Sequence, residues 1–307
     1  MSEFRESEQI GRGWVRPTLL AGGTPEQQAR WIPGIEQGTE SWCQLFSEPE
    51  AGSDLAALRT RAERDGDSYV VNGQKIWTTW ADTARWGILL ARTGGEGSLS
   101  DEPHSSELAS ESRHHSISYF VLDMRAPGIH VRPIVEMTGG HHFNEVFLTN
   151  VRVPIDHRIG EEGDGWKLAT LTLASERDAL SEGGVIWGMG PTSDELFDAL
   201  RKEGVDDPVL RQRAARVYTE KVVLGLVAET AAPSVRKCLA DEHGQHVMSL
   251  MLDTRGTYGM LGEHGEEVKE ADVWYWGYLF SRALTIGGGT AQVQRNVIAE
   301  RLLGLPR

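Results

Sequence analysis

The feature that most constrains the fold is a change of hydrophobic spacing partway along the chain. Between residues 41 and 155, apolar residues gather in short runs that Gly, Pro, Asn and Ser residues separate. From Asp164 onward, apolar residues recur instead at the spacing of an α-helix. A block of strands followed by a block of helices predicts an α+β fold with separate layers, not a doubly wound βαβ fold.

The strand block is expected to form a β-sandwich or barrel, because its strands are short and fairly evenly spaced. The pair Asn72-Gly73 lies between apolar runs at 69–71 and 75–77, a pattern typical of a β-hairpin. Further strands are predicted at 88–90, 117–122, 129–135 and 146–153. The segment 94–116 is rich in Gly, Ser, Glu and His and has no periodicity, so it is predicted to be a mobile surface loop.

Helices are predicted at both ends of the chain. Thr24 offers a hydroxyl N-cap and is followed by Pro25 and by Gln27 at the third helical position, which indicates a helix start. This helix is expected to end at about Ile32, before Pro33. In the helical block, helices are predicted at 164–180, 193–203, 208–232, 270–284 and 291–302.

Charge, cysteine content and missing motifs exclude several classes of protein. Asp and Glu total 45 against 31 Lys and Arg, a formal net charge of −14, and such a surface repels nucleic acid. The two cysteines, Cys43 and Cys238, make neither a disulfide framework nor a metal cluster, so no metal and a reducing, cytoplasmic location are expected. No apolar run reaches the roughly 18 residues of a membrane span. The G-x-G-x-x-G, P-loop, H-E-x-x-H and G-x-S-x-G motifs are absent, which argues against nicotinamide dehydrogenases, NTPases, zincins and α/β-hydrolases.

The first segment with chemical content is 42–54, in which a strand-like start runs into a turn carrying Pro, Gly and Ser. Such a turn exposes backbone N–H groups and hydroxyls to an anionic or carbonyl-bearing ligand. A plain β-turn has the same composition, so this segment alone leaves both interpretations open.

The second segment is 73–80, where Trp77 is followed two residues later by Thr79. On a strand these two side chains point to the same face, so the indole can stack on a planar ligand while the hydroxyl bonds its edge. The alternative is an ordinary core tryptophan.

The third feature is a carboxylate on an otherwise apolar face. Ala169, Thr172, Leu173, Glu176 and Leu180 fall on one stripe of a predicted helix. A carboxylate that is desolvated in such a stripe has a raised pKa, as a general base working near neutral pH requires. The alternative is a Glu paired with an Arg of a neighbouring helix.

The fourth segment is 286–296, in which three glycines precede a helix. Glycines let the backbone approach a ligand closely, and the free N–H groups of a helix start can face developing negative charge. The alternative is a flexible turn between helices.

Taken together and in this order, the four segments resemble the acyl-CoA dehydrogenase family. The matching strings are FSEPEAGSD at 46–54, NGQKIWTT at 72–79, GGTAQVQR at 288–295 and ERLLGLPR at 300–307. The resemblance implies a helical N-terminal domain, a middle β-domain and a C-terminal four-helix bundle. Residues 1–40 would then be a remnant of the first domain, 41–158 the second and 159–307 the third.

The resemblance also implies bound FAD and an acyl-CoA substrate. At the matching positions, the residues expected to line the flavin ring are Gln44, Phe46, Ser47, Trp77 and Thr79. Thr290 and Gln292 are expected to contact the cofactor from the C-terminal end, and Ser53 is expected on the acyl-CoA side.

The implied reaction is α,β-dehydrogenation of the thioester, in which a carboxylate removes the Cα proton and flavin N5 accepts a hydride from Cβ. In many members the base lies just before Gly-Thr of the C-terminal motif, where this chain has Gly288. In isovaleryl- and long-chain-type members it lies in a Leu-x-x-Glu-Arg context, which LASER at 173–177 fits, so Glu176 is the predicted base. The N–H of Gly288 is expected to polarise the thioester carbonyl. An electron-transferring flavoprotein is the expected electron acceptor.

An alternative function follows from two departures from the family pattern. Most of the N-terminal helical domain is expected to be missing, and an Arg-x-x-Phe-Gly segment, which usually binds FAD of the partner subunit, is not found. The alternative is therefore a non-catalytic or truncated subunit that completes a flavin site in a heteromeric enzyme. A homo- or hetero-oligomer is expected under both interpretations.

Overall fold

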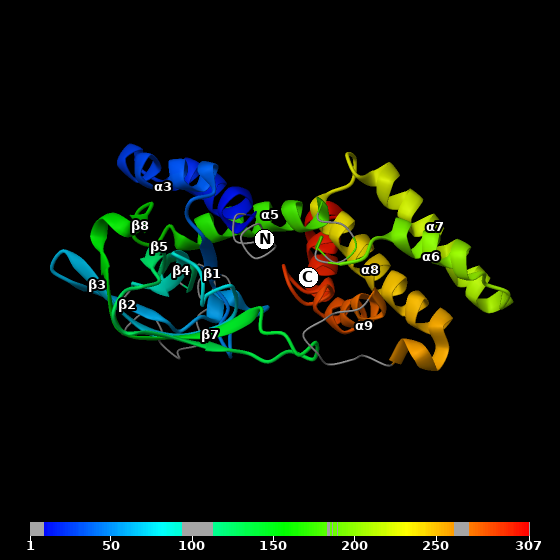
Figure 1. The fold of residues 1–307 in the computed structure, drawn as a ribbon. Helices are drawn as coiled ribbons and strands as arrows, with labels where there is room; N and C mark the ends of the chain where they lie inside the picture. The colour runs from blue at the N-terminus through cyan, green and yellow to red at the C-terminus, as the bar shows by residue number, and fades with distance from the viewer. Residues whose placement is uncertain are drawn as a thin grey trace. The chain divides into compact units, whose positions relative to one another are not determined.

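The structure is a computed structural model that describes residues 9–93, 113–182, 185, 187–188, 190–260 and 270–306. The chain divides into two compact units, Met1–Glu176 and Arg177–Arg307. The first is built on a β-sheet and the second is helical (Figure 1), so the predicted α+β class is confirmed. The predicted mobile loop at 94–116 lies almost entirely outside the described residues.

The first unit contains one mixed sheet with the order β6-β7-β3-β2-β4-β5-β8, and β1 pairs with β4 beside this path. Its strands are β1 (Trp42–Leu45), β2 (Arg61–Asp65), β3 (Ser68–Thr79), β4 (Trp86–Arg92), β5 (Ile117–Asp123), β6 (Ile129–Pro133), β7 (Phe143–Pro154) and β8 (Arg158–Ile159). β1 and β2 run parallel to β4, and the other pairs are antiparallel. The strands predicted at 88–90, 117–122, 129–135 and 146–153 all exist, with shifted ends.

The sheet has a hydrophobic core on each face. Ile88 and Leu90 of β4 pack into one core with the helices of the first unit, whereas Leu89 packs into the other. Every residue of β4 is buried, which explains why 88–90 is uniformly apolar rather than alternating. Tyr69 of β3 contacts Phe120 of β5 across a ring-centroid distance of 5.0 Å although these strands are not neighbours, so the sheet curves around its second core.

Three helices of the first unit cover the first core: α2 (Arg16–Gly22), α3 (Pro25–Gln37) and the part of α5 (Gly165–Glu182) that precedes Arg177. The predicted cap of α3 is confirmed, because Thr24 accepts from the Gln27 N–H and the Gln27 side chain accepts from the Thr24 N–H. The predicted end was wrong: α3 continues through Pro33 to Gln37. Trp31 and Ile35 are 0% and 1% exposed on either side of Pro33, so their burial offsets the backbone hydrogen bond that proline cannot donate.

The predicted hairpin at Asn72-Gly73 was wrong, because both residues lie inside the continuous strand β3. The hairpin turn is at Gly66-Asp67 between β2 and β3, where Gly66 has a φ of 64°. The glycine of the Asn-Gly pair serves a tertiary contact instead. A Cβ at Gly73 would lie 2.3 Å from Thr60 Oγ1.

The second unit contains α6 (Ser193–Glu203), α7 (Pro208–Val227), α8 (Pro233–Arg255), α9 (Glu270–Phe280) and α10 (Ala291–Val297). The bounds of α6 were predicted correctly. The helix predicted at 208–232 was too long, and α8 was not predicted. Ala232 is extended (φ −60°, ψ 148°) before Pro233, and this break separates α7 from α8.

Candidate active site

Two segments that were predicted to bind the cofactor lie side by side in the first unit. The N–H of Ile76 donates to the carbonyl of Ser47 at 3.0 Å, and Lys75 Nζ donates to the carbonyl of Phe46 at 3.0 Å. These bonds hold the end of β1 against the second half of β3. Ser47 and Trp77 therefore come from neighbouring segments although 30 positions separate them in the sequence.

A buried ion pair, which no sequence motif predicts, fixes this junction. Lys75 Nζ lies 2.8 Å from Glu48 Oε1, and their side chains are 0% and 7% exposed. Glu48 also accepts from the N–H groups of Arg59 and Thr60 and from the Thr60 hydroxyl. Burial alone would raise the pKa of Glu48, but the Lys75 charge and these hydrogen bonds outweigh it and hold the pKa below its usual value. Burial lowers the pKa of Lys75, although the adjacent Glu48 opposes this shift.

Trp77 has a strained backbone and an exposed side chain. Its φ is 60°, which is unusual for a bulky residue, and the β3–β7 register shifts between Lys75 and Thr78. Trp77 is 57% exposed, and Phe143 lies edge-on to its indole at a centroid distance of 6.0 Å, so Trp77 is not a core residue. Positive-φ residues of this kind cluster at ligand sites. Thr79 follows on β3, opposite Phe143.

Phe46 occupies a different environment from the one expected. Its side chain is 3% exposed and lies edge-on to Tyr119, at a centroid distance of 5.9 Å, in the core beneath the helices. The Phe46 side chain is therefore part of the core, and the predicted contact of this residue with a flavin ring stays a prediction. Ser53, by contrast, is exposed on the turn that precedes Leu55–Ala57.

The predicted base lies on α5 in contact with β1. Glu176 is 7% exposed, and its Oε2 accepts a hydrogen bond of 3.0 Å from Gln44 Nε2. On the same face of α5, Ala169 and Thr172 are 0% exposed, so the predicted stripe faces the core. Gln44 and Glu176 are 132 positions apart, and no local pattern could have paired them.

The glycine-rich segment of the second unit forms a specific turn. Gly288 and Gly289 have φ values of 62° and 87°. Gln294, 1% exposed, donates from Nε2 to the carbonyls of Gly288 and Gly289 at 3.1 and 3.4 Å. Thr290 caps α10 by accepting from the N–H of Val293 at 3.2 Å, and Gln292 is exposed. These bonds make the segment an ordered turn that the side chain of Gln294, outside the predicted site residues, holds in place.

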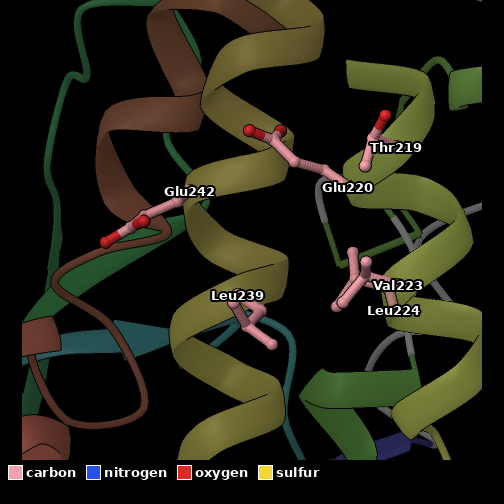
Figure 2. A pocket seen from close by; sticks show the side chains of 6 residues that line it. All are labelled: Thr219, Glu220, Val223, Leu224, Leu239 and Glu242. Carbon is pink, nitrogen blue, oxygen red and sulfur yellow. The ribbon is translucent and has the colours of Figure 1, made fainter. Parts of the chain in front are cut away.

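A pocket in the second unit is separate from these residues. It lies between α7 and α8 (Figure 2) and is lined by Thr219, Glu220, Val223, Leu224, Leu239 and Glu242. None of the predicted site residues lines it. Over the described ranges, no group of three or more His, Cys, Asp or Glu side chains is placed to hold a metal ion. No helix in the part of the chain that the structure describes is long and apolar enough to cross a bilayer.

Comparison with known proteins identifies the family. Residues 43–151 match the family described as acyl-CoA dehydrogenase, middle domain, and residues 163–303 match acyl-CoA dehydrogenase, C-terminal domain. The chain belongs to the acyl-CoA dehydrogenase family, and it is an oxidoreductase of that family.

Individual relatives support this membership. Acyl-CoA dehydrogenase IpdE1 of Mycobacterium tuberculosis is 40% identical over 308 residues, which cover 97% of this chain and 75% of the relative. Among solved structures, the steroid ACAD Tcur3481-Tcur3483 has a TM-score of 0.84 and 29% identity, covering 98% of this chain and 77% of the other. The ChsE4-ChsE5 complex from Mycobacterium tuberculosis has a TM-score of 0.81 and 32% identity, covering 97% and 78%.

Proposed function

We propose that this chain catalyses FAD-dependent α,β-dehydrogenation of an acyl-CoA thioester, with Glu176 as the base. The observation that carries the proposal is the buried Glu176 carboxylate, held by Gln44 in the apolar core between α5 and the sheet. Family membership supplies the class of reaction. The domain boundaries at residues 40 and 158 and the assembly with other subunits stay predictions.

The residues of the first unit fit a planar, hydrogen-bonding cofactor. Trp77 has an exposed side chain, on which a planar ring can stack, and a strained backbone of the kind found at ligand sites. Gln44 Oε1 is buried and has no hydrogen-bond partner among the described residues, so an N–H or O–H donor of a ligand would satisfy it. Gln44, Ser47, Trp77, Thr79 and the main chain of Phe46 are the proposed flavin-holding groups of this unit, with Thr290 and Gln292 in the second. When bound, FAD supplies the acceptor for the hydride that leaves Cβ.

The chain's own residues handle the proton and the thioester. Glu176 takes the Cα proton as the electron pair of that C–H bond forms the Cα–Cβ double bond and the Cβ hydride departs. The N–H of Gly288 polarises the thioester carbonyl and so acidifies the Cα proton. Ser53 lies on the acyl-CoA side. An electron-transferring flavoprotein is the proposed electron acceptor.

The proposal is tested with Glu176→Gln, which keeps the shape and removes the basic group. We expect turnover with acyl-CoA to fall by at least about 10³-fold, because general base catalysis of proton transfer is lost, while bound flavin stays at the wild-type amount. Glu63→Gln, at an exposed position of β2, is the matched control and should leave turnover unchanged. Wild-type turnover in Glu176→Gln would contradict the assignment of the base.

The alternative, a subunit that completes a flavin site in a heteromeric enzyme, is favoured by one observation. The ChsE4-ChsE5 structure, to which this chain is similar, is a complex of two named proteins. The visible spectrum and mass of the purified chain decide between the alternatives. A flavin band that bleaches on anaerobic addition of one thioester from a panel of straight-chain, branched and steroid-derived acyl-CoAs supports the catalytic proposal. A flavin-free chain that binds FAD only after co-expression with a second subunit supports the alternative.

A further inference from the structure

The sheet fixes the backbone position of Gln44. Its neighbours on β1, Cys43 and Leu45, are 0% exposed, and Gln44 itself is in register with Ile88 of β4. The backbone of Gln44 is therefore set by the sheet, and its side chain extends to Glu176. Because an amide has distinct ends, only the Nε2 group can face a carboxylate oxygen favourably.

The helix that carries Glu176, α5, is held by hydrogen bonds of Thr172, one turn before Glu176. Thr172, 0% exposed, is 2.8 Å from the hydroxyl of Thr18 on α2 and 3.1 Å from the hydroxyl of Tyr119 on β5. The surrounding contacts are apolar. Both the backbone and the carboxylate of the predicted base are thus held by polar contacts inside an apolar interface.

We infer that Gln44 is the positioning residue for the Glu176 base. This inference rests on the proposed function. The Nε2–H group donates to Oε2 of the carboxylate and so orients the base. The other end of the amide, the buried Oε1 of Gln44, accepts from a bound ligand, so that one side chain connects the base with the ligand that it serves.

A neutral donor suits this role better than a cation. A hydrogen bond from a neutral amide favours the ionised form of a carboxylate, whereas a buried Lys or Arg at the same place would lower its basicity much further. The hydroxyl of Tyr119 on β5 contacts Thr172, and burial raises the pKa of this hydroxyl, so it stays neutral. Arg177 and Asp178 follow Glu176 on α5.

The test compares Gln44→Met and Gln44→Glu with the wild type. Methionine keeps the length of the side chain and removes the donor, so we expect kcat to fall about 10- to 100-fold with KM changed less than about threefold. The apparent pKa of the base in the pH–rate profile should rise by about one unit in Gln44→Met, and by more in Gln44→Glu, where two carboxylates share one proton. The control is Gln74→Leu, which removes a 3.0 Å hydrogen bond from Gln74 on β3 to Glu145 on β7. It should leave the pH–rate profile unchanged.

A second readout does not depend on turnover. The carboxyl band of Glu176 is identified in infrared spectra of flavin-free, isotope-labelled protein as the band that Glu176→Gln removes, and its titration should move upward in Gln44→Met. An unchanged titration and an unchanged pH–rate profile in both Gln44 variants would overturn the inference and leave the proposed function intact. Loss of flavin with an unchanged titration would also overturn it, because Gln44 would then only hold the cofactor. If Glu176→Gln is itself active, the proposed function fails first.

Discussion

Lys75 carries a buried positive charge, and its ammonium group connects β3 with the segment that follows β1. Its Nζ bonds the Phe46 carbonyl at the end of β1 and the Glu48 carboxylate just beyond it, while its own backbone belongs to β3. A charge without a partner at such depth is strongly unfavourable. The pair therefore determines how the Ser47 and Trp77 segments meet.

Substituting Lys75→Met should lower the free energy of unfolding by about 3 kcal/mol, because Glu48 keeps its buried charge and loses its counterion. Flavin affinity should fall as well. The double variant Glu48→Gln with Lys75→Met should recover part of this stability, since neither side chain is then charged. The matched control is Arg152→Met, which breaks an ion pair with Asp65 whose side chains are 63% and 56% exposed. It should cost less than about 1 kcal/mol. Urea titrations of the four proteins give the comparison, and equal losses in the two single variants would contradict it.

Among the elements, α6, α7 and α8 of the second unit are connected by polar side chains, of which Ser193 and His243 are buried. Ser193 Oγ at the start of α6 is 2.7 Å from His243 Nε2 on α8, and His243 Nδ1 is 3.4 Å from Glu220 Oε2 on α7. His246 Nδ1 also contacts Glu220, at 3.0 Å. Burial lowers the pKa of His243 more than the Glu220 carboxylate raises it, so the imidazole is neutral at pH 7.

This neutral histidine makes the stability of the helical unit depend on pH. The unfolded chain binds a proton at the ordinary pKa of about 6.5, whereas the folded chain binds it only at lower pH. The unfolded state therefore gains protons first on acidification, and the free energy of unfolding falls as pH drops below about 6.5. His243→Gln keeps hydrogen-bonding capacity without titrating, so its stability should change less between about pH 7 and pH 5. Denaturation followed by far-UV circular dichroism measures this, with His130→Gln at an exposed position as the control. The same pH dependence in His243→Gln and wild type would contradict the prediction.

At the scale of the whole molecule, some helix boundaries were predicted from adjacent residues, whereas features that depend on long-range contacts were not. The Thr24 cap and the bounds of α6 follow from a few adjacent residues, which is why both were predicted. The continuation of α3 through Pro33 depends on burial against the sheet, which the local sequence does not contain. α8 was missed because Lys237, Asp241 and His243, all buried, interrupt its apolar period.

The candidate site shows the same division. Motif resemblance predicted Glu176 as the base, and the apolar stripe predicted that its side chain is buried. The structure shows Glu176 buried, and its role as the base stays a prediction. The contacts that fix the site join residues 27 and 132 positions apart, Lys75 with Glu48 and Gln44 with Glu176, and only the folded chain brings them together. The predicted roles of Gly288, Thr290 and Gln292 toward a ligand stay predictions.

The exposure of Trp77 has an optical consequence. Among the described tryptophans it alone is strongly exposed, at 57%, whereas Trp31, Trp42, Trp86 and Trp274 are at most 6% exposed. Acrylamide in solution should therefore quench a red-shifted fraction of the fluorescence, and Trp77→Phe should abolish that fraction. Added FAD should protect it from acrylamide if the indole lies under the bound ring; unprotected emission at saturating FAD would place the cofactor elsewhere. The exposed indole of Trp77 would thus make the intrinsic fluorescence of the protein a reporter of FAD binding.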